Sequence, residues 1–151
     1  MKILMVCLGN ICRSPLAEGV LQHKATVAGL NWEVDSAGVA GYHIGEAPHH
    51  LSQKVAKLNG VDISKQKARK FRPQDLQEFD KIYAMSNDVY GDILRYADNS
   101  TKTKVDLLLN EINPGKNEDL LDPWYGPESD YHLVYDLVDK ACDMIIKKYS
   151  K

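Results

Sequence analysis

The sequence predicts an α/β fold, a single three-layer domain of residues 1–151 with a central four-stranded parallel sheet and helices on both faces. Three observations lead to this prediction. Short apolar runs alternate with segments of helical periodicity, a strand, a helix and a second strand follow one another at the start of the chain, and the length suffices for one sizeable core. Strands joined by such a crossover are parallel, so we expect their carboxyl ends to meet at the edge where ligands bind.

The four expected strands are short and mostly apolar. Residues 3–6, with the sequence ILMV, form a continuous apolar run of the kind found in a strand buried on both faces. The run ends at a turn-like segment, residues 8–10. The other strands are expected at residues 32–36, 81–85 and 104–109.

Periodicity and end signals predict helices between these strands. The first, residues 15–28, is expected to have Ser14 as its N-cap and Pro15 as its first residue, because a proline there gives up an amide that has no partner. The other helices are expected at 51–58, 73–79, 86–96 with Ser86 as a cap, and after a Ser129 cap. The expected inward residues are Val89, Ile93 and Tyr96, followed in the last helix by Tyr131, Val134, Leu137, Val138, Ala141, Ile145 and Tyr149, with Cys142 as core filler.

Composition and charge exclude several functional classes. The chain is 44% hydrophobic and 26% charged, and its net charge of −2 provides no basic field for nucleic acid. No apolar run approaches the length of a membrane span, and the N-terminus lacks the pattern of a signal peptide. Cys7, Cys12 and Cys142 are too few for a disulfide framework, and no Cys/His spacing typical of zinc occurs. We therefore expect a cytoplasmic protein that uses no metal or cofactor and binds neither nucleic acid nor a membrane.

The segment between Cys7 and Arg13 is suited to binding a phosphate-sized dianion. Its backbone amides can turn inward, the following helix adds the positive end of its dipole, and Arg13 offers a planar fork for two phosphate oxygens. The same surroundings favour the thiolate of Cys7, which is the form that attacks phosphorus. The plainer interpretation is a small buried cysteine at a strand end and a surface arginine, and the turn and cap residues within 9–15 count against it.

Three motifs resemble those of the low-molecular-weight protein tyrosine phosphatase family: V-C-x-G-N-x-C-R-S-P at 6–15, S-A-G at 36–38 and D-P-W-Y-G at 122–126. The resemblance covers essentially the whole chain and implies Cys7 as nucleophile, a Ser36–Asn10 hydrogen bond, and Tyr42 beside the ring of the substrate. The residues alone also allow a plain polar strand end at Ser36 and a tyrosine that covers the core edge at Tyr42. The phosphate is expected to bind to the loop described above, which consists of Leu8, Gly9, Asn10, Ile11, Cys12, Arg13 and Ser14.

A carboxylic acid over the cleft is required to protonate the leaving oxygen of a phosphate ester. The loop before the last helix offers three candidates, Glu118, Asp119 and Asp122. The D-P-aromatic-aromatic-G pattern favours Asp122 as the general acid and base. Trp124 and Tyr125 are then expected to wall the opening of the site.

The chain departs from the family pattern at two places. Many members have an acidic residue and an arginine where this chain has His49 and Leu51, which leaves the recognition role of those positions open. The adjacent His49 and His50 are expected at the surface near a helix start, pointing to opposite sides. Ser86 stands where the family usually has an aspartate, so a structural carboxylate contact is either missing or moved to Asp88.

We therefore predict a protein tyrosine phosphatase that hydrolyses phosphotyrosine proteins, peptides and small aryl phosphates through a phosphocysteine intermediate. Ile11 favours phosphotyrosine, because the resemblance implies threonine there in phosphoarginine phosphatases. An arsenate reductase of the same fold has two further redox cysteines, whereas only Cys142 follows here. A non-catalytic phosphate-binding module is the alternative from another class. Cys12 is expected either to form a protective disulfide with Cys7 or to serve in packing, and a monomer is expected.

Overall fold

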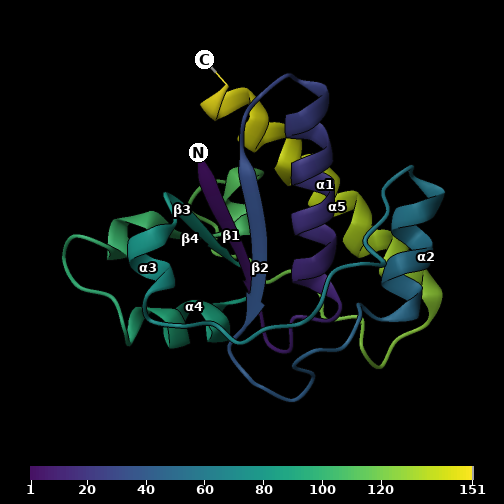
Figure 1. Ribbon diagram of the computed structural model, residues 1–151, viewed down its shortest axis with the longest axis horizontal. Helices are drawn as coiled ribbons and strands as arrows, with labels where there is room; N and C mark the ends of the chain where they lie inside the picture. The colour runs from purple at the N-terminus through teal and green to yellow at the C-terminus, as the bar shows by residue number, and fades with distance from the viewer. Residues whose placement is uncertain (151) are drawn as a thin grey trace.

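A computed structural model describes residues 1–150 and shows the predicted four-stranded, all-parallel sheet. The strand order is β2-β1-β3-β4, and the strands are β1 (Lys2–Cys7), β2 (Glu33–Gly38), β3 (Lys81–Ala84) and β4 (Val105–Leu107). Strand β1 is therefore flanked on both sides. Its last residue, Cys7, is in register with Gly38 at the end of β2, so both lie at the carboxyl edge of the sheet (Figure 1).

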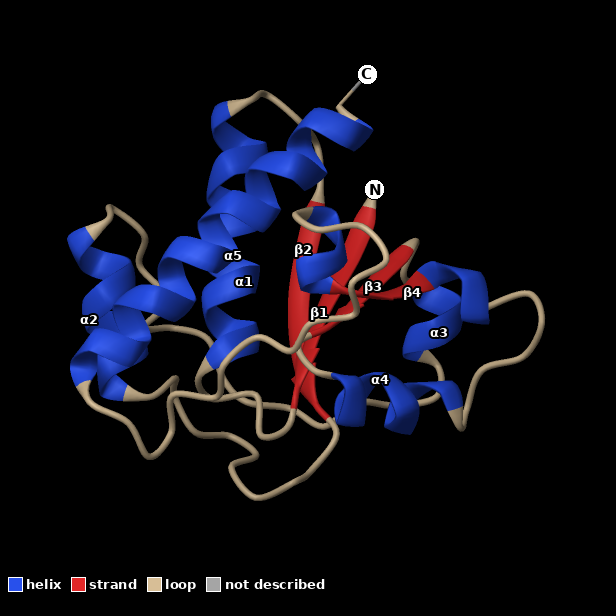
Figure 2. Cartoon of the chain, turned by 180° about the vertical axis from the view of Figure 1, so that it is seen from behind, coloured by secondary structure: helices blue, strands red, loops and turns tan. Residues whose placement is uncertain are grey.

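Helices cover both faces of this sheet, which confirms the predicted three-layer architecture (Figure 2). One face carries α1 and α5, and α2 packs on these two helices. The other face carries α3 and α4. The bounds are α1 (Arg13–Val27), α2 (His50–Leu58), α3 (Asp75–Glu78), α4 (Asn87–Leu94) and α5 (Glu128–Tyr149), with short 3-10 helices at η1 (Lys102–Lys104) and η2 (Leu108–Glu111).

The side chains of β1 alternate between two hydrophobic cores. Ile3 and Met5 join the core beneath α1 and α5, whereas Leu4 and Val6 join the core beneath α3 and α4. All four are fully buried, because successive side chains of a strand point to opposite faces and both faces are covered. This double burial explains the continuous apolar run in the sequence.

Two predicted helix caps are wrong. Helix α1 begins at Arg13, one residue before the expected Ser14 cap, and its N-cap residue Cys12 makes no side-chain capping bond. The Ser14 hydroxyl faces the side chains of Cys7 and Asn10 instead. Ser129 lies inside α5, whose N-cap is Pro127. Ser86 does occupy the N-cap position of α4, but its side chain accepts no capping bond.

Two further predictions at element ends are corrected by the structure. Tyr96 does not point inward: helix α4 ends at Leu94, and Tyr96 is 60% exposed. The fourth strand is shorter than expected, because Leu108 begins the 3-10 helix η2. In the last helix, Tyr131 and Cys142 are fully buried as predicted. Across residues 1–150, none of the helices has both the length and the apolar character that crossing a bilayer requires.

Candidate active site

The loop between β1 and α1 packs tightly against the end of β2. Two backbone hydrogen bonds join them, from the amide of Val39 to the carbonyl of Cys7 (3.1 Å) and from the amide of Ala40 to the carbonyl of Leu8 (2.9 Å). A Cβ atom at Gly38 would lie 2.8 Å from the carbonyl carbon of Gly9. The glycine of the S-A-G motif is therefore required by close backbone approach.

Asn10 organises the loop from within. It is 3% exposed and has a φ of 57°, a left-handed conformation that is uncommon for residues other than glycine. Its Nδ2 atom donates to the hydroxyls of Ser14 and Ser36, both at 2.9 Å, and its Oδ1 accepts from the amide of Arg69 at 3.0 Å. The expected contact between Asn10 and Ser36 is thus present, and these bonds hold the strained backbone in place.

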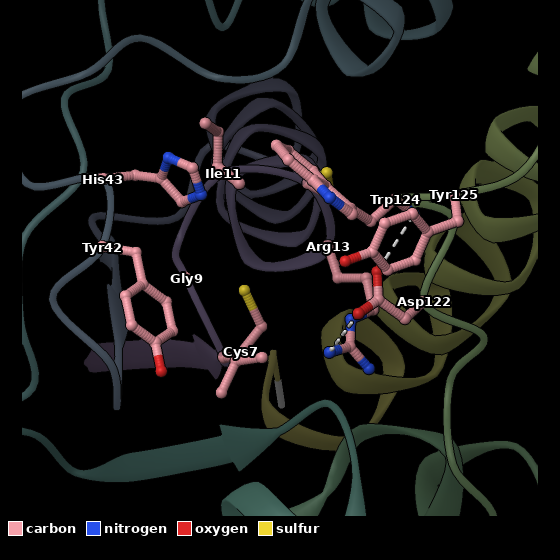
Figure 3. Close-up of a pocket in the computed structure, with 11 residues that line it drawn as sticks. Cys7, Gly9, Ile11, Arg13, Tyr42, His43, Asp122, Trp124 and Tyr125 are labelled. Atoms are coloured by element: carbon pink, nitrogen blue, oxygen red, sulfur yellow. Dashed lines mark hydrogen bonds and ion pairs between the residues drawn. The ribbon is translucent and has the colours of Figure 1, made fainter.

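Two polar groups face the sulfur of Cys7. The backbone amide of Asn10 donates to Sγ at 3.3 Å, and the hydroxyl of Ser14 lies 3.0 Å from it. Cys7 is only 3% exposed, yet its sulfur points into a cavity at the edge of the sheet (Figure 3). The sulfur is therefore not packed into the apolar interior.

Arg13 is buried and links the loop to the segment before α5. Its Nη1 donates to the carbonyl of Leu120 at 3.0 Å, and its Nη2 lies 3.6 Å from a carboxylate oxygen of Asp122. Only 5% of Arg13 is exposed, so the interpretation as a surface cation is wrong. Leu120 is in turn anchored, because its amide donates to the carbonyl of Met85 at 2.8 Å.

These residues surround a cavity of about 290 Å³, close to the small end of ligand-binding sites. The predicted phosphate loop forms its base, and Tyr42 lies across it from Asp122 and Tyr125 (Figure 3). The predicted residues Asn10, Ser14 and Ser36 do not line it but support the loop from behind. The lining residues are Cys7, Leu8, Gly9, Ile11, Cys12, Arg13, Tyr42, His43, Asp122, Trp124 and Tyr125.

Comparison with known proteins identifies the family. The family profile described as "Low molecular weight phosphotyrosine protein phosphatase" matches residues 2–151. The chain belongs to this family. The human low molecular weight phosphotyrosine protein phosphatase is 37% identical over an aligned length of 151 residues, gaps included, and the alignment covers 97% of this chain and 94% of the human protein.

Solved structures show the same fold. A protein tyrosine phosphatase from Entamoeba histolytica, crystallised with Hepes in the active site, superimposes with a TM-score of 0.93 at 36% identity and covers 99% of this chain and 97% of its own. A Drosophila arginine phosphatase superimposes with a TM-score of 0.92 at 30% identity and covers 100% of this chain and 99% of its own. This low molecular weight phosphatase is thus similar to enzymes named for two different phosphorylated residues.

The aromatic walls of the phosphatase cavity are strongly exposed. Tyr42 is 78% exposed and Tyr125 97% exposed, and Trp124 lies beside Tyr125 with ring centroids 6.4 Å apart. The alternative in which Tyr42 covers the edge of the core is therefore wrong. Tyr42 and Tyr125 face the cavity from opposite sides, as Figure 3 shows.

His43 forms part of the wall, which sequence reasoning missed, and His49 lies behind it against Trp124. The His43 ring lies 5.3 Å from the ring of Trp124, and its Nδ1 is 2.8 Å from Glu46. The only signal for His43 was its position next to Tyr42. His49 is half-buried, caps α2 and lies 5.4 Å from Trp124. Burial and the neighbouring His50 lower the pKa of His49.

The expectation that His49 and His50 point to opposite sides is wrong. Their rings stack with centroids 4.4 Å apart, and the other face of His49 stacks on Tyr131 at 5.1 Å. The reason is that His49 precedes the helix, with an extended ψ of 140°, whereas His50 is its first residue. The alternation expected of a regular element does not apply across that boundary.

A carboxylate does support the N-terminal end of α4, but it belongs to Asp119 and not to Asp88. Asp119 accepts from the amide of Asn87 at 2.7 Å and from its Nδ2 at 2.8 Å, and these bonds lower the pKa of Asp119. This engagement, together with its place outside the cavity lining, separates Asp119 from Asp122. Glu118 pairs with Asn113 and also lies outside the lining.

The three cysteines are free and differ in their surroundings. Cys12 is buried, and desolvation raises its pKa to about 12. Its sulfur lies 3.9 Å from the hydroxyl of Tyr131. Cys142 is completely buried in the core, as predicted. Within residues 1–150, no group of three or more His, Cys, Asp or Glu side chains is arranged to hold a metal ion.

Proposed function

We propose that this protein hydrolyses phosphotyrosine and small aryl phosphates through a phosphocysteine intermediate, with Cys7 as nucleophile. The observation that supports this most directly is one cavity that contains the sulfur of Cys7, the guanidinium of Arg13 and the carboxylate of Asp122. A buried arginine beside a cysteine at a helix N-terminus favours both a bound dianion and a thiolate.

In the first step, the thiolate of Cys7 forms a bond to phosphorus as the bond from phosphorus to the leaving oxygen breaks. The loop amides and Arg13 bind the three equatorial oxygens, where charge is stabilised in the transition state. Asp122 gives its proton to the departing oxygen. Asp122 lies on the open side of the cavity, where 47% of its side chain remains exposed to solvent, and this position suits that role.

In the second step, water attacks phosphorus and the sulfur–phosphorus bond breaks. Asp122, now ionised, takes a proton from that water, which is the reverse of its role in the first step. Ser14 lies 3.0 Å from the sulfur and can donate to the thiolate as it leaves. Phosphate and the starting enzyme are the products.

The walls support an aryl substrate. Tyr42 and Trp124 flank the cavity, and Leu8 and Ile11 add apolar surface near its base. A phenyl ring gains from such a lining, whereas a phosphorylated guanidinium brings polar N–H groups that require acceptors. A cytoplasmic location and a monomeric state stay sequence-based predictions.

The test is turnover of p-nitrophenyl phosphate and of matched phosphotyrosine and phosphoarginine peptides, with a chelator present. We expect hydrolysis of the aryl phosphate and the phosphotyrosine peptide, and none by Cys7→Ser, which should trap the phosphotyrosine peptide. If the phosphoarginine peptide is turned over faster than the phosphotyrosine peptide, the enzyme is a phosphoarginine phosphatase. Wild-type protein that binds phosphate but turns over none of the three would indicate a binding module.

A further inference from the structure

A chain of hydrogen-bonded side chains runs behind the phosphate loop and ends at an acidic residue that the mechanism above does not use. It starts at the sulfur of Cys7 and passes through α1, the loop and β2. Each neighbouring pair lies within 3.0 Å. The members, in spatial order, are Cys7, Ser14, Asn10, Ser36 and Glu18.

A backbone group identifies the orientation of the Asn10 amide. The amide N–H of Arg69 can only donate, and it lies 3.0 Å from Oδ1 of Asn10. The opposite side of the amide, Nδ2, therefore faces the two serines and uses its two protons on Ser14 and Ser36, both at 2.9 Å.

Both serine hydroxyls accept from Asn10, so each has its own proton left to donate. The proton of Ser36 goes to Oε1 of Glu18 at 2.6 Å. The proton of Ser14 goes to the sulfur of Cys7 at 3.0 Å. The bond between Ser14 and Cys7, whose direction the positions of the two atoms leave open, thus acquires a direction from the rest of the chain.

A second, competing arrangement explains what Glu18 contributes. If the Asn10 amide were turned over, its Oδ1 would face both serines and accept from each of them, and Ser14 would no longer donate to sulfur. That arrangement leaves Glu18 without the proton of Ser36. Among residues 1–150, the half-buried carboxylate of Glu18 behind β2 is hydrogen-bonded only to Ser36, and it opposes the change because an acceptor that loses its partner on partial burial is costly.

We propose that Glu18 is a positioning residue: as the terminal acceptor of the chain, it holds Asn10 in the orientation that directs the Ser14 hydroxyl proton to the sulfur of Cys7. This rests on the proposed function only in that the sulfur acts as nucleophile and leaving group. A donor on the sulfur stabilises the thiolate and eases its departure from phosphorus. Acceptance requires a lone pair and not a charge, so a glutamine should replace Glu18.

The test compares Glu18→Ala and Glu18→Gln with a matched control, Gln22→Ala. Gln22 lies one turn further along α1 and also ties the helix to the β2 segment, donating to the carbonyl of Trp32 and accepting from the amide of Val34, both at 3.0 Å. It makes no hydrogen bond to the phosphate loop. The first readout is the rate at which iodoacetamide alkylates Cys7, measured by peptide mass spectrometry across pH. The second is the rate of phosphocysteine hydrolysis in rapid-quench experiments.

We expect Glu18→Ala to lower the alkylation rate at pH 6 and the hydrolysis rate each by about 3- to 10-fold. This corresponds to losing part of the charge-assisted hydrogen bond from the Ser14 hydroxyl to the Cys7 thiolate. Glu18→Gln should stay within about 2-fold of wild type, and Gln22→Ala should lower the melting temperature but neither rate. Ser36→Ala, which removes the link while keeping Glu18, should reproduce the loss and replaces Glu18→Ala if that variant does not fold.

Three outcomes would overturn the proposal: wild-type alkylation in Glu18→Ala, equal impairment in Glu18→Gln, or equal impairment in Gln22→Ala. The alkylation readout needs no turnover. Failure of wild type to hydrolyse aryl phosphates would therefore count against the proposed function and leave the positioning role of Glu18 to be decided by alkylation alone.

Discussion

A carboxylate oxygen of Asp122 lies 3.6 Å from Nη2 of the buried Arg13, at the mouth of the cavity that contains Cys7. The two residues come from opposite ends of the chain, and a hydrogen bond from Arg13 to the carbonyl of Leu120 brings their segments together. One arginine is therefore placed both to bind a phosphoryl group and to orient the loop that carries the acid.

Replacing Asp122 by asparagine should slow the enzyme according to the leaving group. We expect kcat for phosphotyrosine to fall by about 10²- to 10³-fold, because a phenolate must leave without a proton, and kcat for 2,4-dinitrophenyl phosphate to fall much less. Steady-state kinetics on a series of aryl phosphates provides the measurement. Glu118→Gln, a neighbouring carboxylate outside the cavity, should have no such effect. Equal losses for all leaving groups would remove Asp122 from the role of general acid.

Replacing Gly38 by alanine should displace the phosphate loop. The new Cβ would lie 2.9 Å from the amide nitrogen of Asn10 and from the carbonyl oxygen of Leu8, and backbone atoms cannot move aside as a side chain does. We expect unfolding in urea to become easier by about 1–3 kcal/mol and activity to be lost. Gly91→Ala in α4 is the control: apart from its chain neighbours and the backbone of its own helix, an added Cβ there meets no atom within 4 Å, and activity should be retained. An active, stable Gly38→Ala protein would contradict the packing described here.

Stability should fall as pH rises from about 4.5 to about 7 through the ionisation of Glu18. Burial raises the pKa of Glu18 from 4.5 to about 7 and nearby Asp35 adds to the rise, while the hydrogen bond from Ser36 and the charge of Arg69 oppose it. The folded state thus holds this proton more tightly than the unfolded chain, so its stabilising contribution is complete below pH 4.5 and lost as pH passes 7.

Urea unfolding of wild type and Glu18→Gln at pH 5 and pH 8 measures this effect. The glutamine variant cannot ionise, so its stability relative to wild type should be higher at pH 8 than at pH 5. A difference between the two proteins that does not change with pH would show that Glu18 ionises in the folded state as it does in the unfolded chain.

Peroxide treatment should show whether oxidised Cys7 forms a disulfide with Cys12 or is oxidised irreversibly. Peroxide converts a thiolate to a sulfenic acid, and the thiol of Cys12 can then displace water to form a disulfide. The raised pKa of Cys12, about 12, keeps it a thiol at neutral pH, so Cys7 should be oxidised first. We expect dithiothreitol to restore activity in peroxide-treated wild type and in Cys142→Ser, and to restore much less in Cys12→Ser. Equal recovery in all three would leave Cys12 with a packing role.

Local patterns were sufficient to predict the strands, most helices and the loop from Cys7 to Arg13. The apolar run of β1 could be interpreted because both faces of that strand are buried, and the loop because anion binding depends on neighbours in sequence. The expected Ser14 cap failed for the opposite reason. Capping rules consider only the nearby backbone, whereas the Ser14 hydroxyl is engaged by the sulfur of Cys7 and the amide of Asn10.

The amino-acid sequence by itself establishes the chemistry available at one edge of the sheet: a cysteine, an arginine and, much further along the chain, an acidic residue. The three-dimensional structure decided which distant groups complete it. Asp119 rather than Asp88 supports α4, His43 enters the cavity wall, and Glu18 ends the hydrogen-bond chain behind the loop. These partners are separated in sequence and carry no shared periodicity, so only the packing of helices and loops around the sheet determines that they meet.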